Sequence, residues 1–193
     1  GDKYNGAEVL FRGSMTPSIE IALSELRGGW RGGPVRLELK KGGGKESFRI
    51  FSDKNGIKIT SAGDAGLLYG AYHLLRMQNT GADMSNIDVS ETPAFDLRIL
   101  NHWDNPDGSI ERGYAGHSLW RWDELPGVVS PRYREYARAN ASVGINGAVL
   151  NNVNASPTIL TKDNLVKVKA IADELRPYGV KTYISVNFAS PMV

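Results

Sequence analysis

The residues best suited to chemistry follow three short apolar runs, each of which gives way to asparagine. The first run continues into Asn101-His-Trp-Asp-Asn105, the second into Asn151-Asn-Val-Asn154, and the third ends at Asn187. An indole packs on the apolar face of a sugar ring, while amides and carboxylates bind its hydroxyl groups. Trp103 beside Asp104 therefore indicates a carbohydrate-binding rim.

Each part of this rim also has a simpler structural interpretation. The loop after the first run can fold on itself, with Asp104 and Asn105 as turn residues and Trp103 as its local core. Asparagines after strands are common turn formers, so Asn152 and its neighbours by themselves indicate no more than a turn. The recurrence of polar clusters after all three runs favours the binding hypothesis for Trp103.

Other candidate groups carry less chemistry. Trp120 and Trp122 lie in a long loop, and we expect them to seal that loop rather than line a cleft. His102 and His117 lack a third ligand at a diagnostic spacing, so we assign no metal. The chain has no cysteine, which excludes disulfides, thiolate metal sites and a cysteine nucleophile.

A complete catalytic apparatus is not evident. Hydrolysis of a glycoside normally uses two carboxylates that flank the bond, and only Asp104 directly follows a predicted strand. The chain shows no glycine-rich phosphate loop and no nucleophile elbow. We therefore predict no catalytic residue and no cofactor. The other acidic residues considered lie far into a loop or in predicted helices: Glu111, Asp123, Glu124, Glu135, Asp163, Asp173 and Glu174.

Composition describes an ordinary globular protein. The 193 residues include 23 Lys and Arg against 21 Asp and Glu, a formal net charge of +2, and 41% are hydrophobic. The charges are scattered, which gives no case for a nucleic-acid partner. No run approaches the roughly 18 apolar residues of a membrane span, so no membrane partner is predicted.

Residues 1–92 are predicted to form a small α/β sandwich domain with a mixed sheet and helices. Thr16-Pro17 is a typical helix start, and Asn55-Gly56 is typical of a hairpin turn. His73, on an apolar helix face, is expected to have a structural role. The predicted elements are a helix from Thr16-Pro17 to Gly28-Gly29, strands at 35–39, 48–51 and 57–60, and a helix after Asp64 with an apolar stripe of Leu67, Leu68, Ala71, Leu74 and Leu75.

Residues 93–193 alternate between strand and helix. Such an order requires right-handed crossovers and a parallel sheet, either open and doubly wound or the opening of a (β/α)8 barrel. A whole barrel needs about 250 residues, so this segment would be its first part, truncated after the first βαβαβ units. The predicted elements are strands at 97–100, 144–150 and 180–186, a helix from Ser130-Pro131 to about Ala141, and a helix after Thr161 with Leu165, Val168, Ile171 and Leu175 inward.

Several motifs resemble one enzyme family. Arg98–Asn105, with its continuation Pro106–Gly116 and Ser118–Trp120, closely resembles the first barrel strand and loop of the family 67 α-glucuronidases. The helix at Gly66–Arg76 resembles the end of their N-terminal domain, although a similar helix occurs in family 20 hexosaminidases.

The resemblance implies a three-part enzyme with an N-terminal α/β domain, a (β/α)8 barrel and a helical C-terminal domain that forms a homodimer. Such enzymes remove 4-O-methyl-D-glucuronic acid from glucuronoxylan-derived oligosaccharides by inversion, without a metal. The residues matching Trp103 and Val153 form an apolar sheath near the 4-O-methyl group. We therefore predict Trp103, Val153, Asp104 and Asn152 as substrate-binding residues.

The family's catalytic acid, its basic carboxylates and its uronate-binding cations come from later barrel strands and match no residue here. The aromatic-rich first strand of its N-terminal domain is not evident in Gly1–Gly13. The chain is therefore expected to be an inactive excerpt of the enzyme. Two alternatives are a noncatalytic carbohydrate-binding module and a fragment of a family 20-like hexosaminidase.

Overall fold

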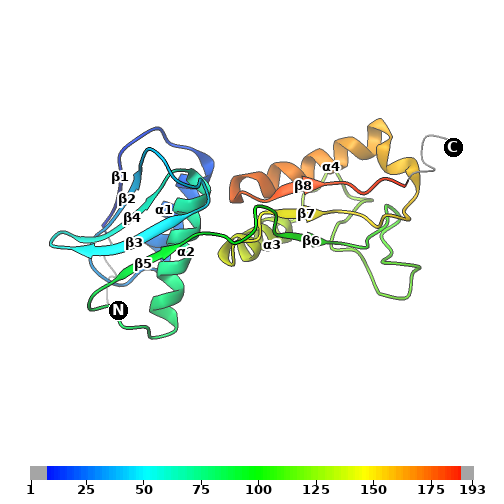
Figure 1. Ribbon diagram of the computed structural model, residues 1–193. Coiled ribbons are helices and arrows are strands. Elements are labelled where there is room, and N and C mark those ends of the chain that lie inside the picture. Colours follow the sequence, from blue (N-terminus) through cyan, green and yellow to red (C-terminus); the bar gives the residue numbers. More distant parts are fainter. Residues whose placement is uncertain (1–7, 188–193) are drawn as a thin grey trace, which may run out of the picture. The chain divides into compact units, whose positions relative to one another are not determined.

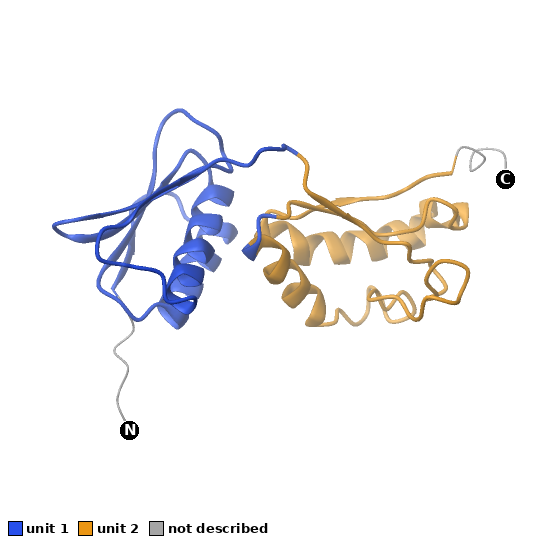
Figure 2. Ribbon diagram, turned by 60° about the horizontal axis from the view of Figure 1, so that its bottom comes forward, with its two compact units in different colours: residues 1–96, 142–144 blue, residues 97–141, 145–193 orange. Residues whose placement is uncertain are grey.

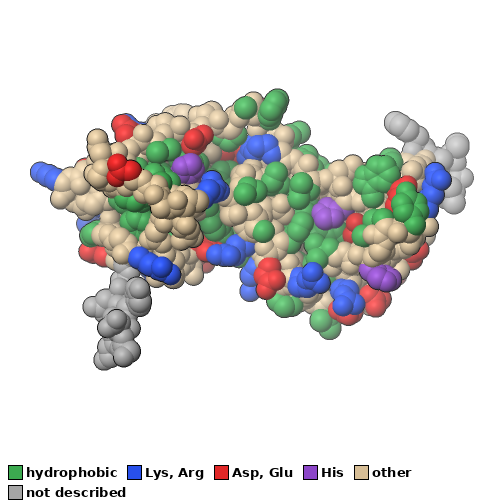
Figure 3. Space-filling view, turned by 90° about the horizontal axis from the view of Figure 1, so that it is seen from below, with side chains coloured by type: hydrophobic (Ala, Val, Ile, Leu, Met, Phe, Trp, Pro, Cys, Tyr) green, Lys and Arg blue, Asp and Glu red, His purple; other side chains and the backbone are tan. Residues whose placement is uncertain are grey.

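The computed structural model describes residues 8–187 and divides the chain into two compact units (Figure 2). Unit 1 runs to Asp96 and includes Ser142–Gly144, while unit 2 comprises Leu97–Ala141 and the residues from Ile145 onward. No helix within residues 8–187 is both long and apolar enough to cross a bilayer. Acidic and basic side chains are interspersed on the face seen in Figure 3.

Unit 1 contains a mixed five-stranded sheet (Figure 1). Its strands lie in the order β1-β2-β4-β3-β5, with β1, β2 and β4 parallel and β3 antiparallel to both β4 and β5. The predicted hairpin is confirmed, because Asp53 pairs with Gly56, whose φ is +112°. The strands are β1 (Val9–Phe11), β2 (Val35–Leu39), β3 (Phe48–Asp53), β4 (Gly56–Ser61) and β5 (Asp88–Glu91).

Two helices, α1 (Pro17–Gly29) and α2 (Asp64–Asn79), cover one face of this sheet (Figure 1). Thr16 begins α1 as predicted, because its hydroxyl accepts a hydrogen bond from the Ile19 amide at 3.4 Å. The predicted apolar stripe of α2 is buried against β3 and β4. Gly70 lets the helix approach closely, since a Cβ there would lie 2.5 Å from Ile59 Cγ2.

Two strands of unit 1, β1 and β5, were not predicted from the sequence. The sequence patterns indicated no strand within Gly1–Gly13, yet β1 lies in that segment and pairs in parallel with β2; residues 1–7 lie outside the described residues. Strand β5 has the sequence Asp-Val-Ser-Glu, which carries a single apolar residue. An edge strand needs few apolar side chains, so neither short segment shows a clear period.

Unit 2 contains three parallel strands, β6 (Ile99–Asn101), β7 (Gly147–Val149) and β8 (Lys181–Tyr183). They neighbour one another in chain order. Figure 2 shows both long helices of this unit on one side of the strands. The helices and 3-10 turns are α3 (Arg132–Ser142), η1 (Pro157–Leu160), α4 (Lys162–Leu175) and η2 (Arg176–Tyr178).

The predicted order of strands and helices in unit 2 is confirmed, but each strand is shorter than expected. Gly179 ends the second helical segment with a φ of +75°. The inward position predicted for Leu165 is wrong, because this side chain is 42% exposed. The buried stripe of α4 is formed by Val168, Ile171 and Leu175. Successive residues of a helix are 100° apart around its axis, which places Leu165 at the edge of this stripe.

Candidate functional site

The carboxyl ends of β6 and β7 continue side by side beyond the strands. Asn101 pairs with Val149, and the His102 amide donates to the Val149 carbonyl at 3.0 Å. The Asn152 amide then donates to the Asp104 carbonyl at 2.8 Å. Backbone pairing therefore holds the residues after β6 against those after β7, and we refer to residues 101–105 and 150–153 as the rim.

The third predicted polar end joins the same rim through Asn151. This buried side chain donates from Nδ2 to the Ser185 carbonyl at 2.9 Å and accepts from the Ser185 amide at 3.0 Å. Beyond the end of β8, the Asn151 side chain thus makes the two hydrogen bonds to the chain that a neighbouring strand would otherwise make with its backbone. The role of Asn151 is to join the chain after β8 to the rim.

The loop after β6 folds back onto the rim. The Asn105 amide donates to the Ser109 carbonyl at 2.9 Å, and the Gly108 amide donates to the Asn105 carbonyl at 3.0 Å. Asp104 forms an antiparallel bridge with Ile110. Part of the structural alternative therefore holds, since this loop does fold on itself. Trp103 is not its local core, however, because it is 49% exposed.

Glu111 reaches the rim through this fold. Its amide donates to the Trp103 carbonyl at 2.8 Å, and its carbonyl accepts from Asn105 Nδ2 at 2.7 Å. Its carboxylate oxygen Oε2 accepts from Asn152 Nδ2 at 3.0 Å. A residue set aside as lying far into the loop therefore sits between Trp103 and Asn152.

Asp104 is a buried member of the rim. The residue is 3% exposed, and its Oδ2 accepts a hydrogen bond from the Ser118 hydroxyl at 2.5 Å. His102 Nδ1 lies 3.7 Å from Asp104 Oδ1, and its Nε2 lies 2.7 Å from the hydroxyl of Tyr136 on α3. The carboxylate, the imidazole and the phenol thus form a chain of polar groups that links the rim to α3.

Burial raises the pKa of Tyr136 to about 12, with the Asp104 carboxylate as a smaller cause in the same direction. Its hydroxyl therefore keeps its proton at neutral pH. It donates to His102 Nε2 when the imidazole carries its proton on Nδ1, and that proton then faces Asp104. This arrangement fixes the orientation of the imidazole between Asp104 and Tyr136.

Trp120 and Trp122 are each 1% exposed, as the sealing hypothesis predicts. The Trp120 ring lies 5.3 Å from the rings of His102, Tyr133 and Tyr136. Aromatic rings at this separation and tilt stabilise one another beyond the area that they bury. The rings of Trp120, Tyr133 and Tyr136 pack together against His102 of the rim, and we refer to them as the aromatic floor.

The four predicted substrate-binding residues come together, but in two layers. Trp103 and Val153 are 49% and 52% exposed, whereas Asp104 and Asn152 are each 3% exposed. These two exposed apolar side chains, in the segments that follow β6 and β7, offer a surface that a ligand can cover. The two buried polar residues hold the backbone that carries them.

Sequence reasoning missed Glu111 and Tyr136. A signal for Glu111 existed, because Asn105-Pro-Asp-Gly108 is a typical turn sequence that sends the chain back towards the strand end. Tyr136 carried no comparable signal. It lies 34 residues from His102 in the sequence, and only the packing of α3 brings the two together.

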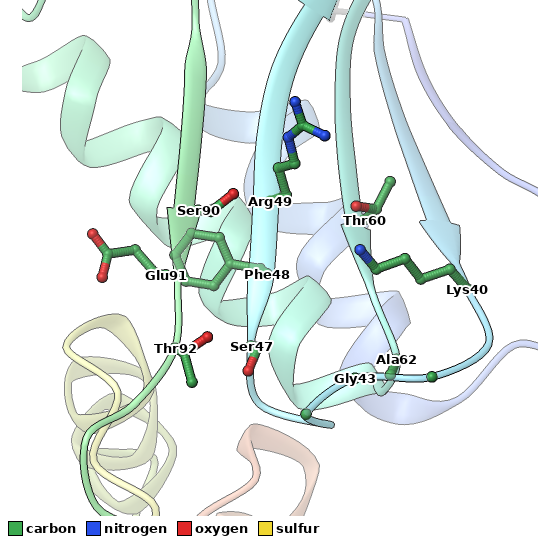
Figure 4. A pocket seen from close by; sticks show the side chains of 12 residues that line it. Lys40, Gly43, Ser47, Phe48, Arg49, Thr60, Ala62, Ser90, Glu91 and Thr92 are labelled. Carbon is green, nitrogen blue, oxygen red and sulfur yellow. The ribbon is translucent and has the colours of Figure 1, made fainter.

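A separate pocket of about 230 Å³ lies in unit 1 (Figure 4). It is lined by the loop between β2 and β3, including Lys40 and Ser47, and by side chains of β3, β4 and β5, among them Thr60. Arg49 also lines it, but its guanidinium makes a two-pronged ion pair with Asp88 at 2.8 and 2.9 Å. Among residues 8–187 no group of three or more His, Asp or Glu side chains is placed to hold a metal ion.

Comparison with known proteins identifies related sequences. Residues 77–193 match the family model described as the glycosyl hydrolase family 67 middle domain. The chain is 44% identical over 149 residues to a probable alpha-glucuronidase A of Aspergillus terreus, covering 76% of this chain and 17% of that protein. The corresponding protein of Neosartorya fischeri is 44% identical over 146 residues, again with 76% and 17% coverage. The chain thus spans about a sixth of the length of these curated relatives.

Solved structures share the fold at low sequence identity. A family 138 glycoside hydrolase that targets pectin rhamnogalacturonan II matches 90% of this chain with a TM-score of 0.65 and 16% identity, over 24% of its own length. A family 115 4-O-methyl-alpha-glucuronidase matches 91% with a TM-score of 0.59 and 13% identity, over 28% of its length. Because the family model covers more than half of the residues, this chain belongs to glycosyl hydrolase family 67.

Proposed function

We propose that this chain is part of an inverting α-glucuronidase that removes 4-O-methyl-D-glucuronic acid from glucuronoxylan-derived oligosaccharides. Membership of family 67 and the activity named for its relatives support the reaction class. The observation that carries the proposal is the pair of exposed apolar side chains, Trp103 and Val153, at adjoining strand ends. A methylated sugar offers an apolar group that such a surface can bind.

The strand order supports a barrel as the parent fold. A doubly wound sheet reverses its strand order and carries helices on both faces. Strands β6, β7 and β8 instead follow one another in chain order, with both helices on one side (Figure 2). In a (β/α)8 barrel, successive parallel strands are likewise neighbours and all helices lie on the outer side of the strands. The proposed organisation is an α/β domain of residues 1–92 followed by the opening strands of a (β/α)8 barrel in residues 93–193.

The substrate-binding residues have distinct proposed roles. Trp103 and Val153 contact the methyl-bearing side of the uronic acid. Asp104 and Asn152 fix the two backbone segments that present them, because from buried positions the Asp104 side chain is hydrogen-bonded to Ser118 and the Asn152 side chain to Glu111. Such support shapes a binding surface without direct contact with the sugar.

The chain by itself is not expected to turn over substrate. Inversion needs an acid and a base about 6.5 to 9.5 Å apart on opposite sides of the bond. Of the carboxylates at the described rim, Asp104 is buried and hydrogen-bonded to Ser118, and Glu111 is bound by Asn152. The acid and the base of the complete enzyme are therefore proposed to come from other barrel strands, and its dimer contacts from a further domain.

Product stereochemistry tests the proposal. A full-length enzyme carrying this chain should release 4-O-methylglucuronic acid from an α-1,2-substituted xylo-oligosaccharide. Proton NMR during the first turnovers should show the β-anomer, as inversion requires. Initial appearance of the α-anomer, or no release at all, would overturn it. Trp103→Ala should lower kcat/KM in the same enzyme.

The 193-residue chain provides the second arm of the test. It should give no hydrolysis above the background of its Trp103→Ala variant, and it should bind 4-O-methylglucuronic acid with a dissociation constant of about 1 mM or weaker. Saturable micromolar binding without turnover would instead favour a noncatalytic carbohydrate-binding module.

A further inference from the structure

Glu111 has a backbone conformation that its residue type does not favour. Its φ is +56°, and it is the sole non-glycine residue with positive φ among residues 8–187. It follows Ile110 in a turn that the Gly113 amide closes by donating to the Ile110 carbonyl at 2.9 Å. A turn position with positive φ normally takes Gly, Asn or Asp. A glutamate here suggests that the long carboxylate side chain itself is needed.

The surrounding contacts fix this strained residue from three sides. Its amide donates a hydrogen bond to the Trp103 carbonyl. Its carbonyl accepts from the Asn105 side chain, and its Oε2 accepts from the Asn152 side chain. Strained residues that their neighbours hold in this way are concentrated at functional sites. The carboxylate therefore has a defined position beside Trp103.

One oxygen of this carboxylate remains available. Asn152 Nδ2 donates to Oε2, and Oε1 has no hydrogen bond or ion pair within the described part of the chain. The Asn152 Oδ1 accepts a hydrogen bond from the Asn154 amide at 2.9 Å. This second bond fixes the orientation of the Asn152 side-chain amide, so that its Nδ2 faces Glu111. Glu111 thus offers one acceptor atom at the rim, on a residue whose amide is bonded to the Trp103 carbonyl.

We propose that Glu111 binds the 3-hydroxyl of the uronic acid through Oε1 and so fixes the orientation of the sugar against Trp103. This inference rests on the proposed function. In a 4-O-methylglucuronic acid joined through C1, only the hydroxyls at C2 and C3 are free on the ring. The C3 hydroxyl neighbours the methylated O4, which the proposed function assigns to Trp103. The hydroxyl donates to the carboxylate oxygen, and no covalent step is involved.

The test removes the carboxylate and the hydroxyl in turn. Glu111→Gly eliminates the carboxylate and also relieves the positive φ, so the enzyme should fold. In the full-length enzyme it should lower kcat/KM on 4-O-methylglucuronosyl xylotriose by about 10- to 100-fold, the loss expected for a charge-assisted hydrogen bond. Glu111→Gln keeps a neutral acceptor and should fall between the variant and the unaltered enzyme.

A 3-deoxy analogue of the same substrate separates binding from a merely structural role. For the unaltered enzyme, kcat/KM on the analogue should be lower than on the parent substrate by a similar factor. For Glu111→Gly, kcat/KM on the two substrates should differ by about threefold or less. Equal losses of the variant on both substrates, or full activity of the variant, would overturn the inference while leaving the proposed function intact.

A control variant and the activity of the unaltered enzyme are measured alongside. Glu124→Gln is the matched control, because Glu124 is exposed and its carboxylate lies 3.8 Å from the Arg121 guanidinium, a loose surface contact. It should leave kcat/KM on both substrates unchanged. Inactivity of the unaltered enzyme on the parent substrate would overturn the proposed function, and the role of Glu111 with it.

Discussion

Asn152 donates from Nδ2 to Glu111 Oε2 at 3.0 Å, although the two residues are 41 positions apart in the sequence. The bond joins the end of β7 to the loop that returns after β6. Because Asn152 is 3% exposed, solvent competes weakly for this contact. The two flanking apolar side chains, Trp103 and Val153, are thereby held on one surface.

Asn152→Asp should destabilise the chain most at neutral pH. The substitution places a second carboxylate against Glu111, and the two negative charges repel one another in the folded state when both groups are ionised. The loss of unfolding free energy is therefore smaller at low pH, where carboxylates take up protons, and larger at neutral pH. Urea unfolding at pH 4.5 and pH 7 should therefore show a larger deficit at pH 7.

The exposed Asn154 provides the matched control, since Asn154→Asp adds the same charge in solvent. Its effect on the free energy of unfolding should remain small at both pH values. An equal response of the two variants to pH would contradict the assigned contact.

Trp103→Ala and Trp120→Ala should separate binding from stability. Trp120 is 1% exposed within the aromatic floor, so its truncation should cost about 3–5 kcal/mol of unfolding free energy. Trp103 is 49% exposed and should cost less than about 1 kcal/mol. Urea denaturation of the two variants checks the order. A larger loss for Trp103 would show that it is a core residue after all.

Gly70→Ala should destabilise unit 1, because the added Cβ would lie 2.5 Å from Ile59 Cγ2 and force α2 away from β4. Overpacking of this kind costs about 1–3 kcal/mol. Gly28→Ala, in α1, meets nothing within 4 Å and should instead stabilise by about 0.5–1 kcal/mol through helix propensity. Thermal unfolding midpoints should move in opposite directions, and a shared direction would refute the packing argument.

His73 should make the stability of unit 1 depend on pH. Burial lowers the pKa of its imidazole, with the nearby Arg76 charge as a further cause, and its ring packs 5.4 Å from Phe48. The unfolded chain binds the proton near pH 6.5. The stability is therefore present above that pH and is lost as pH falls through the lower folded-state pKa.

His73→Gln should flatten this part of the pH profile in equilibrium unfolding between pH 7.5 and 5. The exposed His117 serves as the comparison, and His117→Gln should leave the profile unchanged. Identical profiles for the unaltered chain and His73→Gln would remove His73 as the cause.

Local patterns were sufficient for much of the fold. Thr16-Pro17 begins a helix, Asn55-Gly56 makes a hairpin and Gly179 ends a helical segment because each depends on one or two residues and the nearest backbone groups. The apolar stripe of α2 follows from its 3.6-residue period. Strands β1 and β5 were missed because short edge strands depend on a partner strand rather than on their own pattern.

The sequence by itself determined the order of strands and helices, the polar ends of the three strands and, through the motif after Arg98, the family resemblance that residues 77–193 bear out. Only the tertiary structure divided the rim residues into an exposed pair and a buried pair. It also brought Glu111 to Asn152 and Tyr136 to His102. Periodicity reports which face of an element is buried, whereas contacts between distant segments arise only when strands pair and helices pack.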